Sequence, residues 1–149
     1  MKAALALLLV ITGCVSPGES LYEKLDAKAP KIAEISPPMG GDAGVPSLTP
    51  SQFIVLTFSE TMDLDSLRPG IVIRNKDRKE QPLTIQVDVD QLLPVNAQDL
   101  DVPFKVQISS AEPSGFTTGA YQLILRTLLI DQQGNGLDGE FLGAFNVQF

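Results

Sequence analysis

Hydrophobic and polar residues alternate along several stretches of the chain, and one stretch departs from this pattern. Alternation is clearest where the apolar residues Leu83, Ile85, Val87 and Val89 are separated by Thr84, Gln86, Asp88 and Asp90. A period of two places successive side chains on opposite faces, which predicts a half-buried strand. Residues 53–56 are instead continuously apolar and are followed by the polar Ser59, Glu60 and Thr61. This pattern predicts a central strand over 52–58 that is covered on both faces.

The same interpretation gives about seven strands, which lie at 31–36, 52–58, 70–74, 83–89, 104–109, 121–125 and 145–149. Pro37 and Pro38 end the first strand, and because proline lacks a backbone N–H we expect this strand at a sheet edge. The connections are an irregular loop at 39–50, a polar segment at 60–68 with a helical turn after Asp63, a charged turn at 75–81, and turn regions at 91–101, 110–119 and 131–136. Short strands without a long helix predict an all-β fold, an antiparallel β-sandwich with 52–58 in its middle.

The N-terminus has the layout of a secretory signal. Lys2 precedes a continuous apolar run at 3–11, which is too short to span a bilayer. The next residues complete the string Ile11-Thr12-Gly13-Cys14, which resembles the lipobox of bacterial lipoproteins. The resemblance implies cleavage between Gly13 and Cys14 and lipidation of Cys14, the only cysteine of the chain. A buried core cysteine, or a signal cut elsewhere, is the alternative.

This assignment divides the chain into a signal peptide at 1–13, a lipidated cysteine and tether at 14–29, and a domain at 30–149. Several acyl chains would give stable membrane anchoring, since each buried methylene contributes about 0.8 kcal/mol. No Asp follows the cysteine, and in the enteric lipoprotein family this favours the outer membrane. Ser20 and Glu23 match a capping box for a short helix. A disordered leash with a reach of roughly 20 Å is the other interpretation of the tether.

Composition excludes several functions. The chain has 11 Lys and Arg against 18 Asp and Glu, a net charge of −7, so we expect no binding to nucleic acid. It has no histidine, which removes the commonest general base and zinc ligand, and one cysteine cannot form an intrachain disulfide or a metal cluster. Serine and threonine residues therefore lack a base that could activate them. No pair of carboxylates is placed across a predicted cleft. We expect no enzyme, no cofactor and no metal.

Acidic residues still raise the question of a cation. Glu60, Asp63 and Asp65 could supply oxygen ligands, but the EF-hand spacing is absent, and capping of the following turn by Ser59 or Asp63 is the favoured interpretation. Similarly, the segment 131–135 predicts a tight turn in which Gly134 and Asn135 adopt positive φ. The aspartates that remain are interpreted as solvated loop charges, with a shared calcium site as the alternative: Asp88, Asp90, Asp99 and Asp101.

Two strings, in order and at suitable spacing, resemble the bacterial Ig-like domains first described in surface-layer proteins. They are Phe58-Ser59-Glu60-Thr61-Met62-Asp63 and Asp131-Gln132-Gln133-Gly134-Asn135, and they are accompanied by Ile35-Ser36-Pro37, Gly119-Ala120-Tyr121-Gln122-Leu123 and Phe145-Asn146-Val147. The resemblance covers almost all of 30–149 and implies a non-catalytic Ig-like module. The chain departs from the family in having one copy and a longer, more apolar segment at 91–103. Tyr121, at the start of the penultimate strand, is predicted to form a tyrosine corner, with a surface recognition role as the alternative.

Together these features predict a lipid-anchored protein of the bacterial cell envelope, attached to the membrane through Cys14. Its Ig-like domain would contact another envelope protein or a glycan, through the loop at 91–101 or the turn at 75–81. The alternative is a structural subunit that packs into a larger envelope assembly and binds no free ligand.

Overall fold

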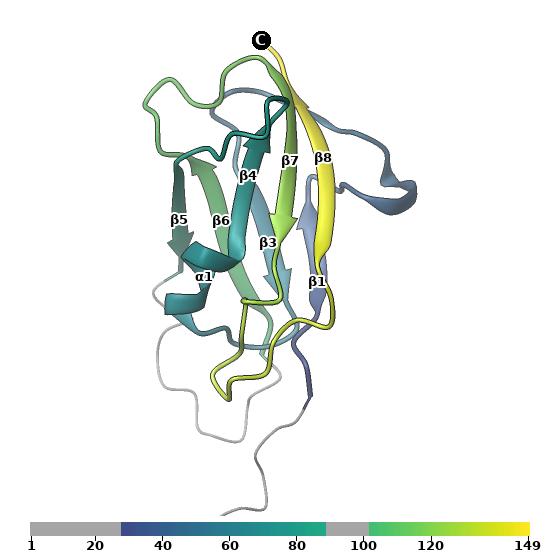
Figure 1. Ribbon diagram of the computed structural model, residues 1–149, viewed down its shortest axis with the longest axis vertical. Helices are drawn as coiled ribbons and strands as arrows, with labels where there is room; N and C mark the ends of the chain where they lie inside the picture. Colours follow the sequence, from purple (N-terminus) through teal and green to yellow (C-terminus); the bar gives the residue numbers. More distant parts are fainter. Residues whose placement is uncertain (1–27, 89–101) are drawn as a thin grey trace, which may run out of the picture.

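The computed structural model describes residues 28–88 and 102–149, in which the chain forms two β-sheets of four strands each (Figure 1). Sheet 1 has the order β1-β3-β6-β5, with β1 at Ile32–Ser36, β3 at Ile54–Phe58, β6 at Phe104–Ser110 and β5 at Leu83–Val87. Sheet 2 has the order β2-β8-β7-β4, with β2 at Ser47–Leu48, β8 at Phe141–Val147, β7 at Gly119–Leu125 and β4 at Ile71–Asn75. The predicted all-β architecture of two packed sheets is confirmed. Gly13, Cys14, the tether up to residue 27 and the loop at 91–101 lie outside the described residues.

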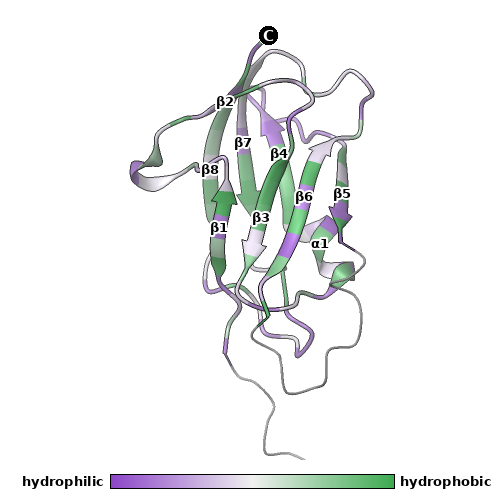
Figure 2. Ribbon diagram, turned by 180° about the vertical axis from the view of Figure 1, so that it is seen from behind, coloured by the Kyte–Doolittle hydropathy of each residue, from purple (hydrophilic) through white to green (hydrophobic). Residues whose placement is uncertain are grey.

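The central position of the strand predicted at 52–58 is confirmed, but the strand begins at Ile54, and Phe53 before it is 46% exposed. β3 pairs with β1 on one side and β6 on the other, and its Ile54, Leu56 and Phe58 have no exposed surface. Figure 2 shows β3 apolar along most of its length, whereas β6 alternates between apolar and polar residues. The neighbouring strands direct alternate side chains into the same core, which includes Phe104, Val106, Ile108, Tyr121, Leu123, Leu125, Phe145 and Val147. The predicted edge position of the first strand is also confirmed, because β1 ends the order of sheet 1.

Two predictions about the strands are wrong. The loop expected at 39–50 contains the short helix η2 (Gly41–Ala43) and β2, which pairs parallel to β8, so the described strands number eight and the sandwich is not wholly antiparallel. Two residues are too few to show an alternating pattern, which explains why β2 escapes sequence analysis. The last strand begins at Phe141 and ends at Val147, and Phe149 is 99% exposed beyond it.

Gly143 explains why the first half of β8 was missed. It occupies a buried position of the strand where a hydrophobic residue would be expected, and so it interrupts the apolar pattern. A Cβ atom at Gly143 would lie only 2.8 Å from Cγ of Met39. The buried Met39, which follows β1, therefore supplies the apolar contact that a side chain at position 143 would otherwise provide.

The helical turn expected after Asp63 is confirmed as α1 (Leu64–Gly70). With seven residues α1 is short, and no helix within the described residues is both long and apolar enough to cross a bilayer. After α1 the chain forms β4 and reverses direction in the predicted charged turn (Figure 1). This turn lies at the opposite end of the sandwich from the point where the chain enters β1. The returning segment then follows β4, because Asn75 N donates to Lys79 O at 3.0 Å and Gln81 N donates to Ile73 O at 2.8 Å. It continues into β5, so the chain passes from sheet 2 to sheet 1 at this edge.

Candidate functional site

The two strings that the sequence analysis singled out lie side by side in the fold. Asp63 N donates to Ile130 O at 2.9 Å, and Met62 forms an isolated β-bridge with Asp131. A longer contact of 3.4 Å joins Gln132 N to Thr61 O. We call the two segments 59–66 and 130–135 together the motif end. Their contact brings most of the predicted site residues into one place.

Asp131 organises its turn with both carboxylate oxygens. It is only 1% exposed, and its Oδ1 accepts the backbone N–H groups of Gln133 and Asn135, each at 2.8 Å. Its Oδ2 accepts the side-chain amide of Asn135, also at 2.8 Å. The predicted tight turn is thereby confirmed, with Gly134 at φ 91°. The expectation that Asn135 also adopts positive φ is wrong, since Arg78 is the one non-glycine residue with positive φ in the described part of the chain.

Asp63 has the predicted capping role. Its Oδ2 accepts the backbone N–H of Ser66 at 3.0 Å, which satisfies one of the free donors at the start of α1. Ser66, itself buried, connects this cap to the second segment of the motif end. Its Oγ donates to Asp63 O at 2.7 Å and accepts from Ile130 N at 3.3 Å.

The three proposed cation ligands occupy different environments. Glu60 is 1% exposed and its Oε1 accepts a hydrogen bond from Ser59 Oγ at 3.4 Å, Asp63 caps α1, and Asp65 is exposed in the first turn of that helix. No group of three His, Cys, Asp or Glu side chains is placed to hold a metal ion anywhere in 28–88 or 102–149. Cation binding by Glu60, Asp63 and Asp65 therefore stays a prediction. The calcium alternative for the loop aspartates falls largely outside the described residues, which include only Asp88 of the four.

The hydrogen bond predicted for Tyr121 is confirmed. Its hydroxyl donates to Thr117 O at 2.8 Å and lies 2.8 Å from Thr117 Oγ1. Tyr121 is 5% exposed, and its ring packs against those of Phe116 and Phe145, with ring centroids 5.4 Å away in both cases. A side chain this buried holds the turn before β7 and cannot act as a surface recognition residue.

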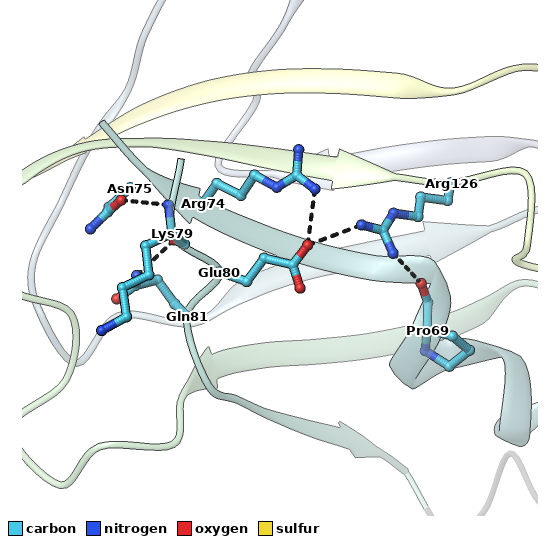
Figure 3. A network of polar contacts seen from close by, with 7 residues as sticks. All are labelled: Pro69, Arg74, Asn75, Lys79, Glu80, Gln81 and Arg126. Carbon is cyan, nitrogen blue, oxygen red and sulfur yellow. Dashed lines mark hydrogen bonds and ion pairs between the residues drawn. The ribbon is translucent and has the colours of Figure 1, made fainter. Parts of the chain in front are cut away.

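The exposed counterpart of the motif end lies beside β4, and sequence analysis did not find it. Glu80 Oε1 accepts a hydrogen bond from Arg74 Nη2 at 2.9 Å and a second from Arg126 Nη2 at 3.1 Å (Figure 3). Arg126 also donates from Nη1 to Pro69 O at 3.3 Å, which connects the network to α1. The pKa of Glu80 lies below its ordinary value, and the largest cause is the hydrogen bond from Arg74. The charges of Arg126 and Arg74 lower this pKa further, whereas desolvation raises it.

Positive charge gathers around this network although the chain as a whole is acidic. Six of the 11 Lys and Arg residues belong to it or to the adjoining α1 and 75–81 turn: Arg68, Arg74, Lys76, Arg78, Lys79 and Arg126. Three acidic residues lie in the same segments, Asp65 in α1 and Asp77 and Glu80 in the turn. We call this surface the arginine edge. Its charged turn was predicted, but Arg126 lies 46 residues from Glu80, and no local pattern points to that contact.

A small recess adjoins Glu80 where the chain crosses between the sheets. Its volume is about 140 Å³. Its wall is mixed: Arg68, Glu80 and Gln81 contribute polar groups, and Ile71, Val72, Leu83 and Ile85 contribute apolar ones. The arginine edge thus combines guanidinium groups with a partly apolar hollow.

Comparison with known proteins does not assign the chain to a group. No protein-family model matches it, and no curated protein matches it.

Proposed function

We propose that the chain is a lipid-anchored bacterial envelope protein that presents one non-catalytic Ig-like domain for contact with another protein or with a glycan. The order of the strands is the observation that carries the proposal. The orders β1-β3-β6-β5 and β4-β7-β8 correspond to strands A-B-E-D and C-F-G of a seven-stranded Ig domain, with β2 as an addition beside the last strand. Tyr121 supports the same assignment, because Ig domains place a tyrosine corner near the start of strand F, which β7 would represent.

The roles of Asp131 and Asp63 support a domain without catalysis. Both carboxylate oxygens of Asp131 accept hydrogen bonds from N–H groups of its own turn, and the carboxylate of Asp63 caps α1. A general acid or base needs a carboxylate that faces a substrate-accessible cleft. The absence of histidine from the sequence points the same way.

The proposed anchor fits the direction of the chain. With residues 1–13 as a signal peptide and Cys14 lipidated, the tether leads into β1 from one end of the sandwich. The turn at 75–81 lies at the opposite end (Figure 1). An anchored domain would therefore hold this turn away from the lipid surface, which we propose to be the outer membrane.

Replacement of the cysteine tests the anchor. We expect the wild-type chain, expressed in a bacterium that lipidates proteins, to incorporate labelled palmitate and to sediment with membranes. Cys14→Ser should abolish the label and release the protein, whereas the control Ser16→Ala should behave as wild type. Intact-mass analysis that finds Cys14 unmodified in the membrane-bound protein would refute the anchor.

Crosslinking in intact cells distinguishes a contact module from a structural subunit. A module that binds its partners transiently should give substoichiometric crosslinks, and these should disappear when the turn at 75–81 is replaced by a short neutral turn. A stoichiometric membrane partner that survives mild detergent would instead favour the structural role.

A further inference from the structure

The charge and shape of the arginine edge indicate the chemistry of a partner, and this inference rests on the proposed role of the domain as a contact module. We propose that the arginine edge binds an acidic segment of a partner protein. A carboxylate of that segment takes the place of Glu80 between Arg74 and Arg126, and a neighbouring aliphatic side chain enters the recess beside them.

The arginines are not fully used by Glu80. Both guanidinium groups donate to the same oxygen, Oε1, and each does so through a single Nη2 atom. Nε of Arg74 is buried and has no hydrogen-bond partner. Carboxylates bind arginine most strongly through two parallel hydrogen bonds, a geometry that Glu80 does not provide. A carboxylate supplied by a partner could instead give each guanidinium group an oxygen of its own.

Glu80 is positioned to be displaced. Its side chain is 54% exposed, while those of Arg74 and Arg126 are 35% and 31% exposed. Ion pairs with this much solvent access contribute little to stability. Glu80 can therefore leave the arginines for water without loss of the fold, and it acts as an internal competitor for their ligand.

The distribution of charge directs an acidic partner to this surface. Six of the 11 basic residues lie at the arginine edge of a chain with net charge −7. The rest of the molecule is accordingly more acidic than its average and repels a negatively charged segment. Such a contrast steers an oppositely charged partner to one face and disfavours other orientations.

The size of the recess favours a single side chain of a peptide. At about 140 Å³ it is smaller than the roughly 300–1,000 Å³ of typical small-molecule sites. Ile71, Val72, Leu83 and Ile85 offer apolar contacts to an aliphatic side chain, beside the polar groups of Arg68 and Gln81. A peptide with alternating acidic and aliphatic residues presents both groups that the arginine edge accommodates.

Peptide binding to the full-length chain, solubilised with its anchor in mild detergent, tests the proposal. The probe is a fluorescein-labelled peptide of alternating Glu and Leu, measured by fluorescence anisotropy at low and physiological salt. We expect saturable binding that Arg74→Gln or Arg126→Gln weakens about tenfold, the effect of one lost hydrogen bond to a charged group. Lys31→Gln instead removes one positive charge from the residue before β1 and should change affinity less than twofold. A peptide with Ala in place of Leu should bind more weakly.

Glu80→Gln gives the sharper result. If Glu80 competes with the ligand, Glu80→Gln should raise the affinity for the peptide severalfold. Adding Lys31→Gln to this variant should again change the affinity less than twofold. A structural ion pair predicts no such gain. Far-UV circular dichroism and the thermal midpoint establish that each variant is folded, and Arg74→Lys provides a second variant that keeps the charge but lacks the fork of donors.

Several outcomes would overturn the proposal. These are no binding by the wild type, equal binding by the arginine variants and Lys31→Gln, or no increase with Glu80→Gln. Arginine-dependent binding of heparin or of phosphatidylglycerol vesicles, without binding of the peptide, would assign the surface to a glycan or a lipid instead. The anchor is tested separately, by membrane fractionation of Cys14→Ser. A protein that is lipidated but does not bind the peptide would therefore refute only this inference.

Discussion

The motif end and the arginine edge both surround a carboxylate with N–H donors, and they differ in where the donors come from. Asp131 is 1% exposed and receives all three of its hydrogen bonds from residues within four positions of itself. Glu80 is 54% exposed and receives its hydrogen bonds from arginines 6 and 46 residues away. The first arrangement is a turn that carries its own acceptor, and the second joins three separate segments at the surface.

This difference determines what each carboxylate can do. Removal of the buried Asp131 acceptor leaves several donors without their protein partner at once, so the arrangement at Asp131 is fixed. Water replaces an exposed ion pair at little cost, so the arrangement at Glu80 is exchangeable. The same residue chemistry therefore supports structure at the motif end and allows recognition at the arginine edge.

The largest effect on stability should come from Asp131→Ala. The change leaves the N–H groups of the half-buried Gln133 and Asn135 without their acceptor, which we expect to lower the free energy of unfolding by about 2 kcal/mol. Asp131→Asn keeps the shape and one acceptor oxygen and should cost less. Urea denaturation followed by circular dichroism measures both, and a loss below about 1 kcal/mol for the alanine variant would contradict the fixed turn.

A smaller effect is expected from Ser66→Ala at the same end. The substitution removes the hydroxyl that bridges Asp63 O and Ile130 N but leaves the cap from Asp63 Oδ2 intact. The loss should be about 1 kcal/mol, typical of one net hydrogen bond. If Ser66 couples the two segments, the double variant with Asp131→Ala should lose less than the sum of the single losses, as a double-mutant cycle would reveal. Strict additivity would argue that the segments are stabilised independently.

The comparison also separates what the sequence could predict from what it could not. Alternation located the strands of the core, and the position of Asp63 before a helical turn pointed to a cap, because both depend on residues close in sequence. Similarly, the turn built by Asp131 is local, so the turn and its glycine could be recognised. The misassigned φ of Asn135 shows the limit of that reasoning: composition indicated a turn, but not which residue takes the left-handed conformation.

Long-range pairing lay beyond the sequence. Ser66 contacts Ile130 across 64 residues and Glu80 contacts Arg126 across 46, and neither contact leaves a periodic pattern. β2 and the first half of β8 were missed for a related reason. The register of β2 depends on β8, and Gly143 fits its position only because Met39 fills the space beside it. These contacts become visible only when the sheets are assembled.

The smallest effect on stability is expected from the ionisation of Glu80, and its pH dependence separates the two regions most directly. Its pKa lies below the ordinary value of 4.5, chiefly because Arg74 donates a hydrogen bond to the ionised form. A carboxyl whose pKa is lower in the folded than in the unfolded state contributes stability above pH 4.5, and this contribution disappears as the pH falls through the folded pKa.

Thermal unfolding of the wild type and of Glu80→Gln should therefore differ slightly at pH 6 and converge as the pH drops well below 4.5. Added salt should also reduce the difference at pH 6, because exposed charges are screened. The Asp131→Ala loss should persist in salt, since it depends on buried hydrogen bonds with neutral donors. If the Glu80→Gln difference survived both acid and salt, it would come from packing, and Glu80 would belong with the fixed carboxylates of the motif end.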